Sequence, residues 1–200
     1  QLDMANEVLL SEFNDSNARK ISKALLTGYE KALPNLAELL TGNNLVMIDM
    51  SGSMGTSILD PNRKTRYSSS CMDKASLIGM TIAKATNADV IRFGSSAEYV
   101  NYNSNSDVFS LAKTVQRDMG GTDLSRAWVL AERSGRKYDR VFILSDNECN
   151  MGSTYSRYTS YVEKVGDPYV YSIDLASYGT MSIAGPKVRY YYGYGYGMFD

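Results

Sequence analysis

The chain has 200 residues, of which 44% are hydrophobic, and a formal net charge of −1 at pH 7. This size suits one well-packed domain of ordinary dimensions with a modest extension. The near-neutral charge gives no indication that the chain as a whole binds nucleic acid. Histidine is absent, which excludes an imidazole base in catalysis and a His-ligated zinc or iron site.

Three further features concern the location of the protein and the extent of the chain. The two cysteines, Cys71 and Cys149, do not make a disulfide framework and fit a reducing compartment. No apolar run approaches the length of a membrane span and no signal-peptide pattern is present, so we expect a cytoplasmic protein without membrane contact. The start at Gln1 instead of Met indicates a processed chain or, as we favour, a fragment of a longer one.

The first part of the chain is predicted to be helical. A helix is predicted over residues 18–33, and Pro34 is expected to end or restart it. A turn-rich break follows at residues 41–44. We therefore interpret residues 1–42 as a helical lead-in, the end of a missing upstream domain, and residues 43–200 as the main domain.

From residue 45 onward, predicted strands alternate with predicted helices. The strands are apolar runs bounded by turn residues, and the helices carry apolar residues on one side. The strands are predicted at residues 45–48, 89–93, 98–100, 140–144, 169–174 and 188–192, and the helices at residues 68–86, 107–116, 124–134 and 158–164. This alternation predicts an α/β fold with a doubly wound, mostly parallel central sheet flanked by helices, of the Rossmann-like type.

Polar residues lie on three loops at the predicted carboxyl edge of the sheet, where such sheets bind ligands. Asp49, Ser51 and Ser53 directly follow the first strand, Asp146 follows a later strand, and Thr122 lies on a glycine-rich loop before a helix. Carboxylate and hydroxyl oxygens suit Mg²⁺, Mn²⁺ or Ca²⁺ rather than zinc or copper. The pattern therefore predicts a site for one hard divalent cation, with Mg²⁺ favoured.

This set of residues resembles the metal-ion-dependent adhesion site (MIDAS) of von Willebrand factor A (vWA) domains. The family pattern is Asp-x-Ser-x-Ser, then a Thr on a second loop and an Asp on a third, and all five residues match it in order. The resemblance implies that the serines coordinate the ion directly and that the Thr and the two Asp complete the shell, directly or through water. It also implies an open position for an acidic group of a protein partner.

Neighbouring residues have structural interpretations. Asp123 is interpreted as a helix N-cap instead of a ligand, and Glu148 as a neighbour of the site or a solvated loop charge. The Tyr-Gly-rich tail at residues 190–197 has two interpretations. Its rings could stack on exposed bases, or it could form a final edge strand, which the scarcity of nearby Lys and Arg favours.

The segments that flank the site are similar to those of TROVE-module proteins, the Ro autoantigen family with its bacterial and phage members. The similar segments are the lead-in with Ala24, Leu25, Tyr29 and Ala32, the residues Asn35 and Leu36, and the stretches 173–180 and 197–200. This resemblance implies a vWA domain within a Ro-like ribonucleoprotein. Small noncoding RNA would then be bound by the missing upstream domain.

We therefore expect a metal-dependent interaction module and not an enzyme, and four alternatives stay open. The first is a stand-alone vWA adhesion domain of another parent protein. The second is a metal-dependent hydrolase, which the missing histidine disfavours. The third is a mononucleotide-binding domain, although no G-x-G-x-x-G or P-loop sequence follows the first strand. The fourth is direct nucleic-acid binding by this chain, which the near-neutral charge disfavours.

Overall fold

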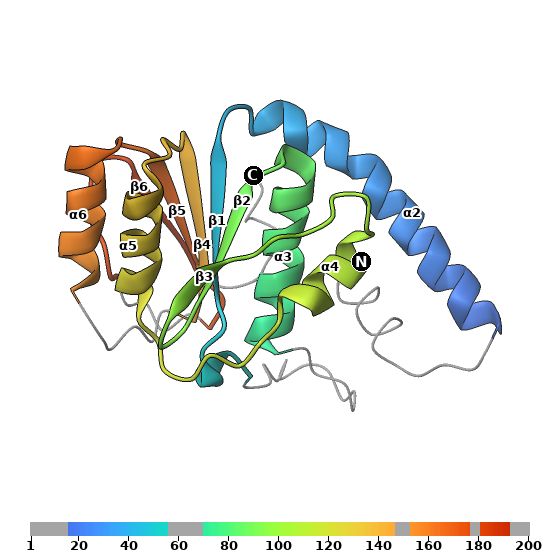
Figure 1. Cartoon of the computed structure of the whole chain (residues 1–200). Helices are drawn as coiled ribbons and strands as arrows, with labels where there is room; N and C mark the ends of the chain where they lie inside the picture. Colours follow the sequence, from blue (N-terminus) through green and yellow to red (C-terminus); the bar gives the residue numbers. More distant parts are fainter. Residues whose placement is uncertain (1–15, 56–69, 147–152, 177–180, 193–200) are drawn as a thin grey trace.

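The computed structural model describes residues 16–55, 70–146, 153–176 and 181–192 (Figure 1). At its centre is a six-stranded sheet with the strand order β3-β2-β1-β4-β5-β6. The strands are β1 (Asn44–Asp49), β2 (Asp89–Phe93), β3 (Ala97–Tyr99), β4 (Arg140–Ser145), β5 (Tyr169–Asp174) and β6 (Val188–Tyr192). Every neighbouring pair is parallel except β2 and β3. The predicted α/β fold with a mostly parallel sheet is confirmed.

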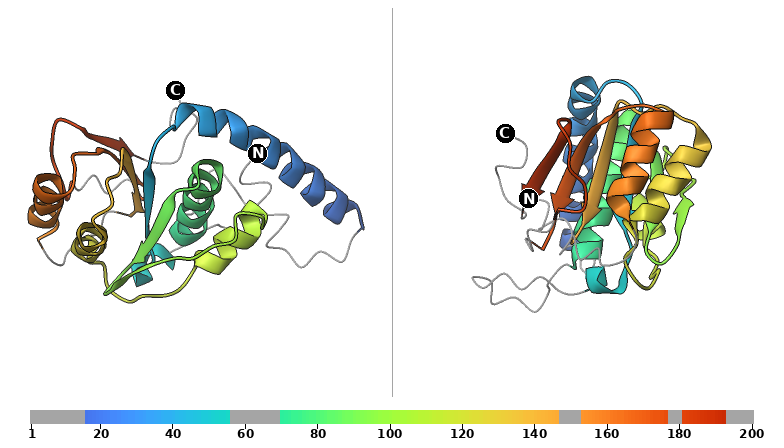
Figure 2. Two further views of the ribbon diagram at one scale, coloured as in Figure 1. Left: turned by 45° about the horizontal axis from the view of Figure 1, so that its top comes forward. Right: turned by 90° about the vertical axis from the view of Figure 1, so that its left-hand side faces the viewer.

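Helices cover both faces of this sheet (Figures 1 and 2). They are α2 (Ser16–Leu39), the short 3₁₀ helix η1 (Gly52–Gly55), α3 (Cys71–Thr86), α4 (Val108–Val115), α5 (Leu124–Ser134) and α6 (Thr154–Lys164). The helices α5 and α6 pack on one face. The helices α3 and α4 pack on the other face, together with part of α2. In the described part of the chain, no helix is both long and apolar enough to span a membrane.

The strand β1 lies in the middle of the molecule, and every one of its residues is buried. Val46 and Ile48 join the core under α3, and Leu45 and Met47 join the core under α5. Burial on both faces explains why the sequence shows a continuous apolar run here instead of an alternating pattern. It also places Asp49, the last residue of β1, at the centre of the carboxyl edge of the sheet.

The first described helix, α2, continues through Pro34 to Leu39, so the prediction that Pro34 ends or restarts the helix was wrong. Proline removes one helical N–H and crowds the preceding turn, which costs about 3 kcal/mol in a helix interior. Packing offsets this cost, because Leu33 is buried and Leu36 and Leu40 pack against the core. The second half of α2 therefore shares the core of the sheet domain.

Two other helices begin at residues different from those predicted. The helix α3 begins at Cys71, where Ser70 Oγ accepts from Asp73 N–H at 3.1 Å and the Asp73 carboxylate accepts from Ser70 N–H at 2.9 Å. This reciprocal capping box fixes the start of the helix. The helix α6 begins at Thr154, four residues before the predicted start at residue 158.

The interpretation of the C-terminal strand can be checked only in part. Residues 190–192 belong to β6, which lies at the edge of the sheet, and the Tyr190 hydroxyl donates to the Ile183 carbonyl at 2.7 Å. This agrees with the edge-strand interpretation of that part of the tail. The predictions for residues 1–15, Glu148, Cys149 and 193–200 lie outside the described residues.

Candidate metal-binding site

The first loop of the candidate site is a turn built on Asp49. Its Oδ1 accepts from the Ser51 N–H at 2.9 Å, and the Ser51 carbonyl then accepts from the Met54 N–H at 3.1 Å as η1 begins. This turn brings the hydroxyls of Ser51 and Ser53 to 3.2 Å from each other. The two serines converge because the chain turns after β1 and enters the 3₁₀ helix η1.

The second loop carries Thr122 and is joined to the first by backbone hydrogen bonds. The Gly52 N–H donates to the Gly120 carbonyl at 2.8 Å, and the Met119 N–H donates to the Met50 carbonyl at 2.8 Å. Gly120 has a φ of +77°, a left-handed conformation that glycine adopts without strain. These bonds hold the buried Thr122 on the loop that lies beside the two serines.

The residue after Thr122 caps a helix. Asp123 is the N-cap of α5, and its carboxylate accepts from the Ser125 N–H at 3.1 Å. It also bonds Arg126 at 3.1 Å. The prediction that Asp123 caps a helix is confirmed.

The third loop follows β4 and carries Asp146. The preceding residue, Ser145, donates its hydroxyl hydrogen to Asp49 Oδ2 at 2.6 Å, which joins the third loop to the first. Asp146 is buried, and its charge acts on Asp49. The structure therefore brings the loops of all five predicted residues to one edge of the sheet, with Asp49 at the centre.

The electrostatics of Asp49 reflect its burial. The side chain is 0% exposed, and burial raises its pKa to about 6 against the opposing effect of the hydrogen bonds from Ser145 and Ser51. The negative charge of Asp146 also contributes to this increase in pKa. A carboxylate in this position needs a positive charge nearby to be stable in its ionised form.

Two residues at the same edge were missed by the sequence analysis. Ser145 was assigned no role from the sequence, although its hydroxyl donates to Asp49 directly. Asp174 ends β5 opposite Ser145 in the strand register and is fully buried. Asp49 and Asp146 were identified because they lie at the carboxyl ends of strands. Asp174 also lies at the carboxyl end of a strand, so the same argument could have identified it.

The negative charges of these carboxylates act together on a buried thiol, that of Cys71. The pKa of Cys71, at the start of α3, is raised to about 11, mainly by burial and in part by the negative charges of Asp146, Asp174 and Asp49. The start of α3 therefore lies close to all three carboxylates. Within the described ranges, no group of three or more His, Cys, Asp or Glu side chains is arranged to hold a metal. The predicted set differs from such groups because three of its five donors are hydroxyls.

The comparisons with known proteins identify the family. Residues 43–164, more than half of the chain, match the sequence model of the Ro60 vWA domain. The chain belongs to this vWA family. The vWA fold agrees with the mostly parallel sheet flanked by helices, and the matched region begins where β1 begins.

One solved structure shows the same fold. The Ro (RSR) protein of Deinococcus radiodurans aligns with a TM-score of 0.69 and 20% identity over 88% of this chain and 36% of that one. The chain thus spans about a third of the length of the Deinococcus protein. Two more distant structures also align. A BatB protein of Bacteroides thetaiotaomicron has a TM-score of 0.47 and 20% identity over 68% of each chain. An aerotolerance-related membrane protein of Bacteroides fragilis has a TM-score of 0.49 and 19% identity over 66% of this chain and 67% of that one. The search of curated proteins found no match.

Proposed function

We propose that this vWA domain is a protein-interaction module that depends on one bound Mg²⁺ ion, with Mn²⁺ or Ca²⁺ as substitutes. The ion would be held by Asp49, Ser51, Ser53, Thr122 and Asp146. The observation that carries the proposal is the fully buried carboxylate of Asp49, which lies close to Asp146 where three loops meet. Two buried carboxylates beside two hydroxyls 3.2 Å apart form a set of hard oxygen donors that fits such a cation.

The same donor set supports a role in interaction. Two carboxylates and three neutral hydroxyls give the site no excess of negative charge over the Mg²⁺ ion. The ion can therefore still attract a further anionic ligand. Asp49 is oriented by Ser51 and Ser145, which fixes its oxygens at the loop junction. We propose that the carboxylate of an acidic residue on a protein partner occupies the remaining position, and that the domain performs no catalysis of its own.

Calorimetric titration of the chain with Mg²⁺ tests the metal site. Asp49→Ala should abolish Mg²⁺ binding, because it removes the central carboxylate. Asp167→Ala is the matched control, since Asp167 is an exposed aspartate paired with Lys187 at 2.9 Å on a loop before β5. Equal Mg²⁺ affinity of the Asp49→Ala and Asp167→Ala variants would overturn the proposal.

A crystal grown with Mn²⁺ tests the interaction role. We expect an octahedral ion at Ser51 and Ser53, with a carboxylate of a neighbouring molecule in the open position. Turnover of phosphate esters by the Mg²⁺-loaded chain, lost in Asp49→Ala, would instead support the hydrolase alternative and contradict an interaction module.

We also propose that this domain works within a Ro-like ribonucleoprotein, in which an upstream domain binds small noncoding RNA. The family match and the Deinococcus Ro fold support this placement. In gel-shift experiments, a longer protein that includes the upstream domain should bind a small structured RNA, and the 200-residue chain should not. Steeply salt-dependent binding of that RNA by the 200-residue chain would contradict this division of roles.

A further inference from the structure

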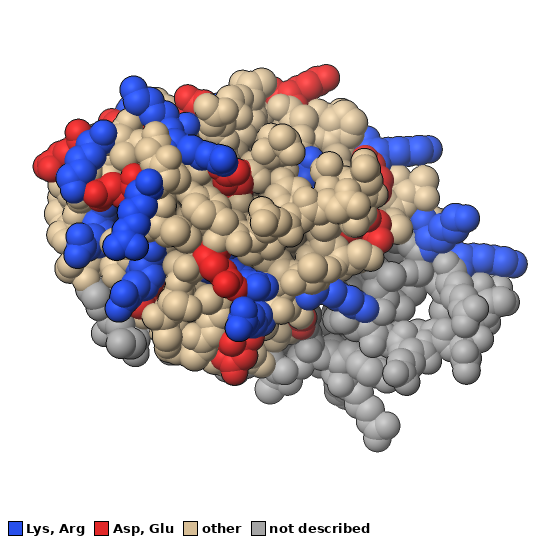
Figure 3. Space-filling view, in the orientation of Figure 1, with Lys and Arg blue, Asp and Glu red and all other residues tan. Residues whose placement is uncertain are grey.

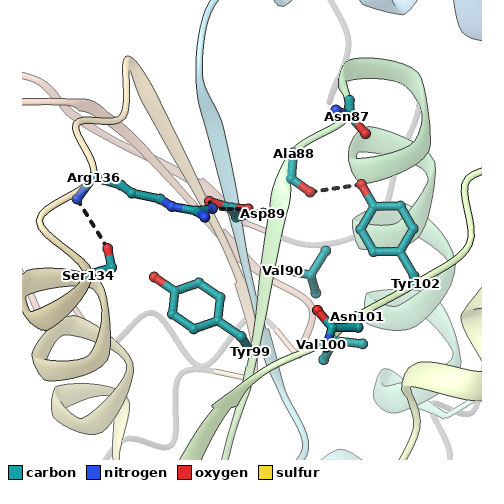
Figure 4. Close-up of a pocket in the computed structure, with 10 residues that line it drawn as sticks. All are labelled: Asn87, Ala88, Asp89, Val90, Tyr99, Val100, Asn101, Tyr102, Ser134 and Arg136. Atoms are coloured by element: carbon teal, nitrogen blue, oxygen red, sulfur yellow. Dashed lines mark hydrogen bonds and ion pairs between the residues drawn. The ribbon is translucent and has the colours of Figure 1, made fainter.

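A polar groove lies along the amino-terminal edge of the sheet, opposite the proposed metal site (Figure 4). It consists of two chambers of about 520 Å³ each. Asn87, Asp89 and Arg136 line both chambers, so the chambers adjoin at these residues. The first chamber also contains Tyr99 and Asn101, whereas the second lies beside the start of β1.

Arg136 reaches across the groove to Asp89 and is held there (Figure 4). Its Nη1 donates to Asp89 Oδ1 at 2.7 Å and Oδ2 at 2.6 Å, and Asp89 Oδ2 also accepts from the Tyr138 hydroxyl at 2.7 Å. Within the described part of the chain, Nε and Nη2 of Arg136 have no hydrogen-bond partner. A guanidinium that is fixed on one side and available on the other is suited to bind a phosphate through two hydrogen bonds.

The second chamber adds a cation and an amide side chain of fixed orientation. Lys137 is exposed there, so with Arg136 two cations face the single carboxylate of Asp89. Asn44 is buried, and its Nδ2 donates to the carbonyls of Leu40 at 2.8 Å and Gly42 at 3.1 Å, which fixes the orientation of the amide. Its Oδ1 has no partner among the residues that the structure describes. Because this oxygen is itself shielded from solvent, a ligand in the chamber does not reach it.

The first chamber has a preformed wall and an aromatic side. The Tyr102 hydroxyl shares its one hydrogen between the carbonyls of Ala83 at 2.9 Å and Ala88 at 2.8 Å, which fixes the ring at the end of α3. Tyr99 stands on the opposite side, and Asn101 is exposed at the lower rim (Figure 4). An aromatic ring, an amide and a fixed wall suit the ring of a sugar or a base.

The charge of the surrounding surface favours an anion. Figure 3 shows Lys and Arg side chains gathered on the left of this face, over α5 and α6. The exposed cations on these helices and the loop after α5 are Arg126, Arg133, Arg136, Lys137, Arg157 and Lys164, which outnumber the acidic residues of the same segments, Asp123, Glu132, Asp139 and Glu163. The chain as a whole has a net charge of −1, so this local excess is compensated elsewhere. Such a field attracts anionic ligands to the groove.

We propose that this groove binds a sugar phosphate, with nucleoside monophosphates as the representatives of suitable size. The phosphate lies at Arg136 and Lys137, and the rest of the ligand lies against Tyr99 and Asn101. The site does not use a glycine-rich phosphate loop at the carboxyl edge, which the sequence lacks. It is also independent of the metal ion at the other edge of the sheet.

Calorimetric titrations of the chain with AMP, ribose 5-phosphate and inorganic phosphate test this site. Arg136→Ala should weaken binding of AMP and of ribose 5-phosphate about ten- to a hundredfold, because it removes charged hydrogen bonds to the phosphate. Lys137→Ala should weaken both by a smaller factor. Arg126→Ala is the matched control: Arg126 and Arg136 are both 63% exposed and paired with an aspartate, but Arg126 lies outside both chambers.

The outcomes separate the proposal from its alternatives. AMP and ribose 5-phosphate binding that is lost in Arg136→Ala, kept in Arg126→Ala and unchanged by EDTA would support it. Inorganic phosphate that binds as tightly as AMP would overturn it in favour of a simple anion site. A glutamate-rich peptide that binds through Arg136 in preference to AMP would overturn it in favour of an acidic protein segment. Absence of saturable AMP binding at millimolar concentrations would also overturn it.

Discussion

At the scale of single residues, the carboxylate of Asp49 is held on both sides. The Ser51 N–H donates to one oxygen and the Ser145 hydroxyl donates to the other at 2.9 and 2.6 Å. The first bond comes from the local turn, and the second comes from the neighbouring strand β4. A ligand carboxylate fixed in this way pays less conformational entropy when an ion binds.

Removal of the second bond should therefore weaken the metal site without removing a ligand. We expect Ser145→Ala to reduce Mg²⁺ affinity about ten- to a hundredfold, the range seen when a hydrogen bond that orients a metal ligand is lost. Ser134→Ala removes a serine hydroxyl that bonds a helix carbonyl far from the site and should leave the affinity unchanged. Calorimetric titration of both variants measures the difference, and equal affinities would show that Ser145 does not position Asp49.

These residues also show what the sequence could predict about the site. Asp49, Ser51 and Ser53 are close together in sequence and follow a recognisable strand, so a local pattern identifies them. The role of Ser145 depends on the register of β1 and β4, in which Ile48 pairs with Leu144, and no local pattern encodes that register. For this reason a local pattern predicts the candidate donors, whereas it does not predict the residue that orients their central carboxylate.

At the scale of secondary-structure elements, α2 is the helix whose prediction was least accurate. Leu33, which precedes Pro34, is 8% exposed. The helix α2 also contacts α3 through a hydrogen bond between Tyr29 and Thr81 and an ion pair between Glu30 and Lys84 at 3.1 Å. A helix prediction from sequence weighs the local cost of proline, but it does not include these tertiary contacts. The same limit applies to the early start of α6, where Thr154 is buried.

The packing of α2 leads to a prediction about stability. Leu33→Ala should lower the free energy of unfolding by about 2 kcal/mol or more, because it leaves a cavity between α2 and the core. Leu39→Ala is the matched control on the same helix, since Leu39 is 75% exposed, and it should change stability by about 0.5 kcal/mol or less. Urea denaturation measures both values. If Leu33→Ala were as mild as Leu39→Ala, α2 would not be part of the cooperative domain.

At the scale of the whole molecule, the two edges of the sheet have different chemistry. The carboxyl edge gathers buried carboxylates and hydroxyls, whereas the amino-terminal edge holds Arg136 and Lys137 in an open polar groove. The strand β1 runs between them and is buried throughout. Because a rigid strand separates the two sites and no described residue belongs to both, we expect their ligands to bind independently.

This independence can be measured by thermal unfolding. At a free Mg²⁺ concentration about 100 times its Kd, the ion should stabilise the fold by about 2.7 kcal/mol, which raises the Tm of a domain of this size by about 5–10 °C. EDTA or Asp49→Ala should remove the increase, because both remove the ion from the buried carboxylates. Arg136→Ala should preserve it, because Arg136 lies at the opposite edge. A loss of the Mg²⁺-dependent increase in Arg136→Ala would show that the two edges are coupled, and its persistence in Asp49→Ala would place the ion elsewhere on the molecule.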